Sequence, residues 1–242
     1  MSFMRAPFLA LIANRDGKSV SVVSIQGLTV PLEQQTTAVV IAPDGKRAFV
    51  CLNLVHKIGV LAIDGQNVTY DKSMDIPSAF NPYNIDITPD GKYVIASNTG
   101  AQKNNADAEV IIEATGPHPH VVDVMAPGTG PEGFAIAPNG KIAATPLLLG
   151  TSAKDGDWFK TKAGELVVMS IGAGGKLTVT ARAPLGGLPE GIAYSPNSDY
   201  LYVANYFEKD LQVFQLGGGK LTEVGPRLKL PGQPASMRAP AR

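Results

Sequence analysis

The sequence predicts an all-β fold built from repeated four-stranded units, and three observations support it. First, one nine-residue pattern recurs at residues 38–46, 84–92, 133–141 and 191–199. Its prolines, Pro43, Pro89, Pro138 and Pro196, are 46, 49 and 58 residues apart, in or above the range of a four-stranded propeller blade. Second, each copy ends in a turn sequence. Third, the apolar runs are short and show no helical period.

Each unit divides into four strands. The first strand is the repeated pattern, and it ends at a Pro-Asp-Gly or Pro-Asn-Gly turn, where proline presets φ and glycine or asparagine accepts a positive φ. The second strand is apolar and closed by asparagine, as in residues 8–14, 48–53, 93–98 and 201–205. The third strand alternates, as in residues 19–22, and glycine-rich turns such as Asp64-Gly65 lead into the fourth.

The apolar first and second strands need cover on both faces, because a sheet with one wet face would alternate strictly. Blades packed around an axis supply that cover. We therefore expect residues 1–242 to form a single β-propeller domain.

The expected number of blades is five, since five second strands can be recognised, one of them divergent and following Gly140. Residues 2–7 and 235–240 both look like degenerate first strands, and the first unit needs only one. We expect the C-terminal segment to pair with the first unit, which closes the ring and removes an open sheet edge. The alternative is a partial or reduced seven-bladed propeller.

Composition excludes several classes of partner. Basic and acidic residues number 21 each, so no net charge favours nucleic acid or an anionic membrane. No apolar run reaches the roughly 18 residues of a membrane span. The chain has one cysteine, Cys51, so neither an intramolecular disulfide nor a multi-cysteine metal cluster is expected. Residues 8–14 fit a strand better than a signal peptide, which favours the cytoplasm and leaves the periplasm open.

The candidate site lies on one face of the ring. The loops before the first strands carry Glu132 and Glu190, with Thr37 and Tyr83 at equivalent places. The second strands end on the same face at Asn14, Asn53, Asn98 and Asn205. Such oxygen-rich groups suit a divalent cation, Ca²⁺, Mg²⁺ or Mn²⁺, with Glu132 and Glu190 as its ligands. The alternative is that each asparagine caps its strand by bonding to nearby backbone.

Two further features fall on this face. His56, in a loop between second and third strands, could act as a general base, and the alternative is an exposed loop histidine. The connections 100–108 and 148–164 are long and polar, and the second contains Trp158, the only tryptophan. We expect Trp158 to form a lid or binding lip. Pro146 should end its strand early and make the nearby pocket wall apolar.

The segment Tyr200-Leu-Tyr-Val-Ala-Asn-Tyr206, followed by Leu211-Gln-Val-Phe214, resembles the YVTN-type repeat of lactonase-like β-propeller families. This resemblance covers most of the chain and implies the propeller fold. The Glu and Asn set also loosely resembles the metal site of gluconolactonase-type propellers. Proteins with this fold carry out unrelated functions, so the resemblance is good evidence for the fold and poor evidence for the activity.

Two functions remain open. No nucleophilic triad, phosphate-binding loop, dinucleotide fingerprint or zinc motif is present. In the first function, the protein is a small-molecule enzyme, a lactonase-like hydrolase or a lyase, with a cation on Glu132 and Glu190 and with His56 as base. In the second, it is a non-catalytic propeller that binds a ligand or a protein. The expected ligand-binding residues are Asn14, Asn53, Tyr83, Asn98, Trp158, Asn205 and Tyr206.

Overall fold

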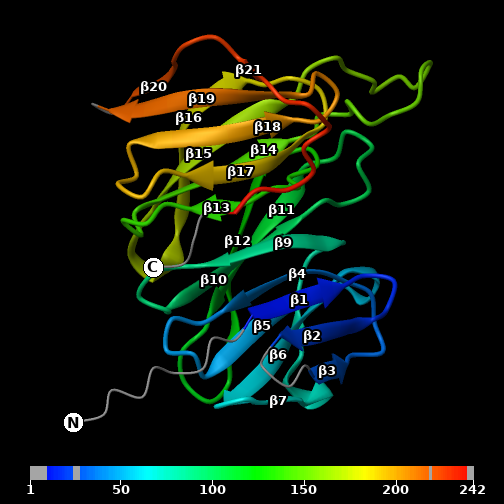
Figure 1. Cartoon of the computed structure of the whole chain (residues 1–242), viewed down its shortest axis with the longest axis vertical. Helices are drawn as coiled ribbons and strands as arrows, with labels where there is room; N and C mark the ends of the chain where they lie inside the picture. The colour runs from blue at the N-terminus through cyan, green and yellow to red at the C-terminus, as the bar shows by residue number, and fades with distance from the viewer. Residues whose placement is uncertain (1–9, 24–27, 218–219, 239–242) are drawn as a thin grey trace.

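The computed structural model describes residues 10–23, 28–217 and 220–238, and these form five antiparallel sheets (Figure 1). Along the main path of every sheet, three or four strands consecutive in sequence lie side by side. The all-β prediction is confirmed, and the repeated four-stranded sheets make the fold propeller-like.

The sheets follow the predicted units. The first contains β1 (Ala10–Asn14), β2 (Ser19–Val23) and β3 (Leu28–Pro31). The second contains β4 (Thr36–Ile41), β5 (Arg47–Leu52), β6 (Lys57–Asp64) and β7 (Asn67–Tyr70). The third contains β9 (Pro82–Ile87), β10 (Tyr93–Asn98), β11 (Asp107–Glu113) and β12 (His120–Gly128). The fourth contains β13 (Ala135–Ile136), β14 (Ile142–Leu147), β15 (Glu165–Ile171) and β16 (Leu177–Pro184). The fifth contains β17 (Pro189–Tyr194), β18 (Tyr200–Asn205), β19 (Asp210–Gly217) and β20 (Lys220–Glu223).

Short elements complete the sheets. β8 (Ile76–Pro77) pairs with β6, and β21 (Leu228–Lys229) pairs with β19. The helical segments described are single 3₁₀ turns, η1 (Asn53–Val55), η2 (Lys72–Met74) and η3 (Ala173–Gly175). No helix in the described ranges has the length and apolarity needed to cross a bilayer.

The predicted turns form as expected. Gly45, Gly91 and Gly140 have φ of 68°, 72° and 68°, a region that favours glycine. The amide of each donates a 2.8 Å hydrogen bond to the carbonyl three residues earlier. The repeated Pro-Asp-Gly and Pro-Asn-Gly sequences thus make the same tight turn between the first and second strands of three sheets.

The core lies between the sheets. Phe49 of β5 and Val94 of β10 are fully buried in one cluster, which joins the second and third sheets. Leu166 of β15 and Leu201 of β18 are fully buried in another, which joins the fourth and fifth. Apolar residues on both faces of second strands such as β5 and β10 therefore have cover, as their sequence predicted.

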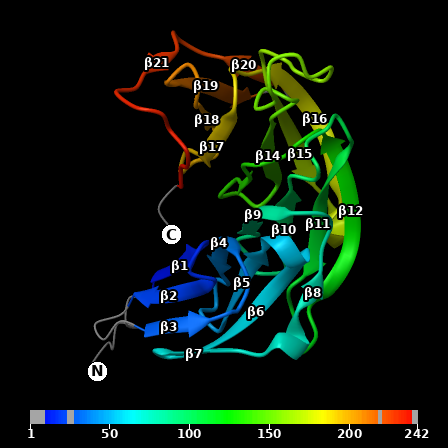
Figure 2. The same cartoon turned by 90° about the vertical axis from the view of Figure 1, so that its right-hand side faces the viewer.

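The sheets stand in an arc around a centre, with β1, β4, β9, β13 and β17 innermost (Figure 2). The first and fifth sheets form the two ends of the arc, and the C-terminal segment runs on that side. β1 ends at Asn14, so it corresponds to the second of the four strands predicted for each unit. The predicted first strand from residues 235–240 does not pair with β1 within the described part, because residues 233–238 are not in a strand. Residues 2–7, 8–9 and 239–240 lie outside the described ranges.

Pro146 does not end its strand, so that prediction was wrong. β14 continues through Pro146, which pairs with Leu166, to Leu147, which pairs with Glu165. The Pro146 carbonyl accepts a hydrogen bond from the Glu132 amide at 3.4 Å, so the side of Pro146 that lacks an N–H faces the loop before the two-residue strand β13 and not β15. The ladder between β14 and β15 therefore loses no hydrogen bond to the proline. Leu147 is fully buried in the core between the third and fourth sheets and is not among the residues that line the cavity described below.

Candidate functional site

A cavity of about 500 Å³ lies among the innermost strands. Glu132, Glu190 and Tyr83 supply its polar groups, together with Thr37, Asn84, Ser236 and Arg238. The remaining wall is mostly apolar and consists of Leu11, Ala13, Ala38, Val39, Ile192, Ala235 and Met237. The cavity thus takes residues from β1, β4, β9, β17, the loop before β13 and the C-terminal segment.

A close backbone contact brings the two glutamates together. Gly133 follows Glu132, and a Cβ atom added to Gly133 would clash with the Glu190 carbonyl oxygen. Any side chain at this position would therefore push the loop before β13 away from β17. The Thr145 hydroxyl donates a 2.8 Å hydrogen bond to the Gly133 carbonyl, which fixes the loop to β14. The glycine after glutamate is thus what lets Glu132 and Glu190 share one cavity.

The two carboxyls influence each other electrostatically. Burial, and after it the charge of Glu132, raises the pKa of Glu190 to about 7. Burial also raises the pKa of Glu132, which is 7% exposed. A hydrogen bond from Tyr83 and the charge of Arg15 act in the opposite direction on Glu132. Near neutral pH, Glu190 can therefore both accept and release a proton.

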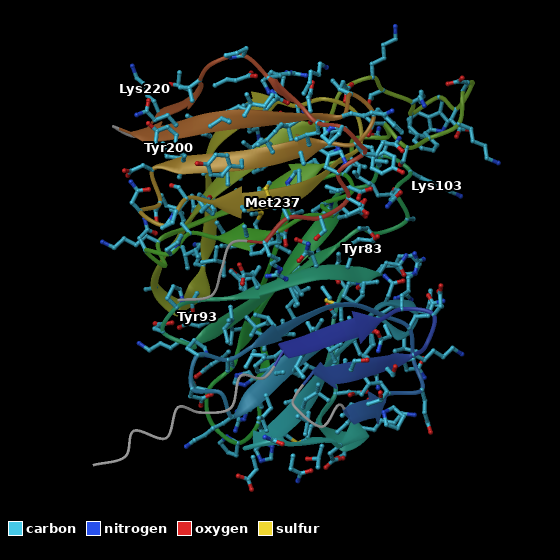
Figure 3. All side chains as sticks on the ribbon, viewed as in Figure 1. Tyr83, Tyr93, Lys103, Tyr200, Lys220 and Met237 are labelled. Carbon is cyan, nitrogen blue, oxygen red and sulfur yellow. The ribbon has the colours of Figure 1, made fainter. Side chains whose placement is uncertain are left out.

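Tyr83 completes this group from β9. Burial, followed by the charge and hydrogen bond of Glu132, raises the pKa of the phenol to about 12. The tyrosine thus stays protonated and acts as a donor toward Glu132. Figure 3 shows Tyr83 beside β9. Among the ion pairs of the described residues, none includes Glu132 or Glu190, so no basic side chain in contact neutralises the pair.

The four asparagines form hydrogen bonds at the ends of their strands and do not line the cavity. Asn205, fully buried, donates to Oδ1 of Asp210 at 2.8 Å and to Oε1 of Gln212 at 2.9 Å. Asn98 and Asn53 donate to backbone carbonyls, at 2.8 Å for Ala96 and 3.1 Å for Pro82. Asn14 donates to the hydroxyls of Ser19 and Ser21. Asn53, Asn98 and Asn205 thus bond to backbone, as in the strand-capping alternative, whereas Asn14 bonds to side chains.

His56 is not brought to the cavity either. It follows η1 with φ of 58°, and its Nδ1 accepts a 3.2 Å hydrogen bond from the Asn81 amide. Its ring lies 4.3 Å from the Phe80 ring, centroid to centroid. These contacts hold His56, in the β5–β6 connection of the second sheet, against the segment that leads into the third sheet.

The loop of residues 148–164 is ordered by its own contacts. The Lys160 ammonium donates to the Ala153 carbonyl at 2.6 Å, and the Thr161 hydroxyl donates to the Leu149 carbonyl at 2.7 Å. Trp158 is 79% exposed and packs edge-on against Phe159. Neither Trp158 nor Tyr206 lines the cavity, and the loop projects from the body in Figure 1. The other long connection, residues 100–108, lies beside this loop, since the Ser152 hydroxyl lies 3.5 Å from Oε1 of Gln102.

The cavity offers a cation two carboxylates, from Glu132 and Glu190, and hydroxyl oxygens from Thr37 and Tyr83. No group of three or more His, Cys, Asp or Glu side chains suited to a metal occurs among the described residues. Six to eight oxygens are usual for Ca²⁺, so the rest would have to come from water or substrate.

Sequence reasoning missed the C-terminal contribution to this cavity. Met237 and Arg238 were expected in a closing strand, and instead they line the cavity as irregular chain. The signal that could have indicated a different role is the isolated arginine in an otherwise apolar stretch, Ala235-Ser-Met-Arg.

The fold is shared with proteins of known structure. No family model matches the chain, and no curated protein sequence does. A candidate 6-phosphogluconolactonase from Bacteroides uniformis is 16% identical, with a TM-score of 0.74 over 92% of this chain and 68% of that one. A second, from Bacteroides fragilis, is 18% identical, with a TM-score of 0.74 over 94% and 69%. Hydrazine synthase from Kuenenia stuttgartiensis is 18% identical, with a TM-score of 0.57 over 98% and 90%. At these identities the likeness shows the fold alone.

Proposed function

We propose that the protein is a small-molecule hydrolase of the lactonase type, with Glu190 as general base in the cavity. The observation that supports this most is the pair of carboxyls in one cavity, Glu132 buried and Glu190 half-buried, with a pKa of about 7 for Glu190. A base is most effective when its pKa is near the working pH. The lactonase candidates among the structural neighbours agree with this substrate class.

The chemistry requires only water and a cyclic ester. The Glu190 carboxylate accepts a proton from a water molecule as the water oxygen attacks the ester carbonyl. The carbon–oxygen bond of the ring then breaks, and the alkoxide formed takes the proton back from Glu190. The product is an open-chain hydroxy acid. The charge of Glu132, added to the larger effect of burial, raises the pKa of Glu190 into the range in which a general base is effective.

A divalent cation, Ca²⁺, Mg²⁺ or Mn²⁺, remains part of the proposal. Glu132 and Glu190 would hold it as ionised ligands, and when bound it would polarise the ester carbonyl in place of general-base catalysis by Glu190. A cation that binds only the folded protein raises its melting temperature. Thermal unfolding with each ion and with chelator tests this directly. Equal melting temperatures in all conditions, or an unchanged ion response in Glu132→Gln and Glu190→Gln, would remove the cation from the proposal.

A second candidate is a non-catalytic propeller that binds a ligand or protein through the loop of residues 148–164. The observation that favours it is the 79% exposure of Trp158 on a loop held in place by its own hydrogen bonds. Exposed aromatic side chains are enriched at binding surfaces.

Proton release during hydrolysis of sugar δ- and γ-lactones, followed in a pH-stat, separates the two candidates. We expect wild-type protein to exceed the uncatalysed rate and Glu190→Gln to lose at least about 100-fold, as expected for a general base. Glu113→Gln, on the outer part of the third sheet, serves as the matched control. A Glu190→Gln variant with wild-type turnover would exclude Glu190 as the base. No hydrolysis of any lactone by wild-type protein would favour the binding function.

A further inference from the structure

The C-terminal residues 233–238 fill the side of the cavity that the arc of sheets leaves open. We propose that these residues, named here the strap, control the access of ligands to Glu132 and Glu190. Arg238 holds the strap in its closed position. This proposal concerns access to the cavity and holds whether the cavity is catalytic or only binds ligand.

The strap forms a wall between the fifth and first sheets. On one side Met237 packs on β17, where a Cβ added to Gly191 would lie 3.3 Å from Met237 Cβ. On the other side, Leu11 and Ala13 of β1 line the same cavity as the strap. Figure 3 shows Met237 beside β17, and Figure 2 shows the chain passing from the fifth sheet toward the centre.

Arg238 fixes the end of the strap to the third sheet. Its Nη2 donates to the Ile85 carbonyl at 2.9 Å and lies 3.4 Å from Oδ1 of Asn84. Its Nη1 lies 3.6 Å from Oδ1 of Asp86. All three partners belong to β9, so one guanidinium links the strap beside the fifth sheet to the third sheet. Its planar set of donors suits several acceptors at once, which lysine could not match.

Little else holds the strap. The last backbone hydrogen bond before it runs from the Leu230 amide to the Lys209 carbonyl. Within the described part of the chain, residues 231–238 make no hydrogen bond from backbone to backbone. Most of the strap is exposed. A segment with few buried contacts and unpaired backbone opens at low free-energy cost. The contacts of Arg238 and Met237 therefore set how often the strap opens.

Accessibility of a cysteine placed behind the strap tests the proposal. Ala13→Cys puts a thiol in the cavity wall on β1. The natural Cys51 is fully buried and serves as an internal reference. N-ethylmaleimide labelling of each cysteine is followed by peptide mass spectrometry, in Ala13→Cys alone and combined with Arg238→Ala or Met237→Ala. Arg227→Ala is the control, since Arg227 lies nearby in the chain and pairs with Glu223.

We expect Arg238→Ala to accelerate labelling of the introduced thiol by about tenfold or more, as release of a weakly held segment should. Met237→Ala should accelerate it less, and Arg227→Ala should leave it unchanged. Labelling of Cys51 should stay slow in all variants. Equal labelling rates of the introduced thiol with and without Arg238→Ala and Met237→Ala would overturn the proposal. A parallel rise at Cys51 would do so too, because it would indicate general loosening.

Discussion

The Ser97 hydroxyl donates a 2.7 Å hydrogen bond to Oε2 of Glu109, while Oε1 of the same carboxyl has no partner among the described residues. Glu109 is fully buried on β11, and burial raises its pKa to about 8, against the opposing effects of the hydroxyls of Ser97 and Thr145. A buried carboxyl with so few donors is held in its neutral form at pH 7.

Glu109→Gln should therefore make the protein more stable at high pH. The pKa of Glu109 is higher in the folded than in the unfolded protein, so folding takes up a proton between the ordinary value of 4.5 and about 8. The stability from this group is fully present below pH 4.5 and is lost as pH rises toward 8. Each pKa unit corresponds to about 1.4 kcal/mol. Urea unfolding at pH 5 and pH 8.5 should show a smaller difference for Glu109→Gln than for wild type or Glu113→Gln. A pH dependence of Glu109→Gln identical to that of wild type would contradict the neutral buried carboxyl.

Glu132→Gln should lower the pKa of Glu190 below 7. The substitution removes a negative charge that disfavours ionisation of Glu190, while burial, the larger cause, remains. The pKa should thus fall but stay above its ordinary value of 4.5. Carboxyl ¹³C NMR titration measures this. If lactone hydrolysis is found, its rise with pH should move to lower pH as well. A Glu190 titration unchanged by Glu132→Gln would mean that the two carboxyls do not interact.

Much of the fold could be predicted from the sequence because its signals are local. The Pro-Asp-Gly turns require a positive φ at Gly45 and Gly91, and the structure has it. Apolar second strands such as β5 and β10 are buried on both faces, as unbroken apolar runs indicate. The strand containing Pro146 was predicted wrongly, because whether a proline interrupts a strand depends on the neighbouring strand's hydrogen bonds.

The site could be predicted only in part. Glu132, Glu190 and Tyr83 occupy the same place in successive repeats, and repeat symmetry puts them at one cavity. His56 and the asparagines also share a face, but their side chains bond to adjacent backbone and side chains. The position of Arg238 depends on contacts with β9, more than 150 residues away in sequence, which no local pattern encodes.

Asn205→Ala should destabilise the fifth sheet. The Asn205 carboxamide accepts from the Gly186 amide at 2.9 Å and donates to Asp210 and Gln212, all in buried surroundings. Loss of the side chain leaves these polar groups with fewer partners, at a cost of about 2–3 kcal/mol. Denaturant unfolding with the exposed Asn67→Ala as control measures the difference. A change below about 0.5 kcal/mol, the usual size for surface substitutions, would contradict the capping role.

Closure of the five-bladed ring stays a prediction. If the C-terminal segment completes the first sheet, deletion of residues 232–242 should expose the edge of β1 and promote aggregation. Analytical ultracentrifugation of the shortened and full-length chains tests this. A shortened protein that stays in the same oligomeric state, with an unchanged melting temperature, would contradict closure.

The lid role of residues 148–164 also stays a prediction, and the structure sharpens its test. Trp158 is 79% exposed and lies outside the cavity wall, so a lid would have to move inward when ligand binds. The base of the loop is anchored, because the Leu188 amide donates to the Thr151 hydroxyl at 3.0 Å and the Gly164 amide donates to the Gly186 carbonyl at 2.9 Å. Movement should therefore be confined to the tip around Trp158, as in loops that close over substrates.

Trp158 is the only tryptophan, so its fluorescence reports on the tip alone. A lactone that binds the cavity should shift the emission to shorter wavelength, because closure removes the indole from water. Trp158→Ala should weaken binding by about threefold to thirtyfold without lowering the melting temperature, since an exposed side chain adds little to stability. Phe207→Ala, which removes another exposed aromatic, is the control. Binding with unchanged emission and wild-type affinity in Trp158→Ala would show that the loop is no lid.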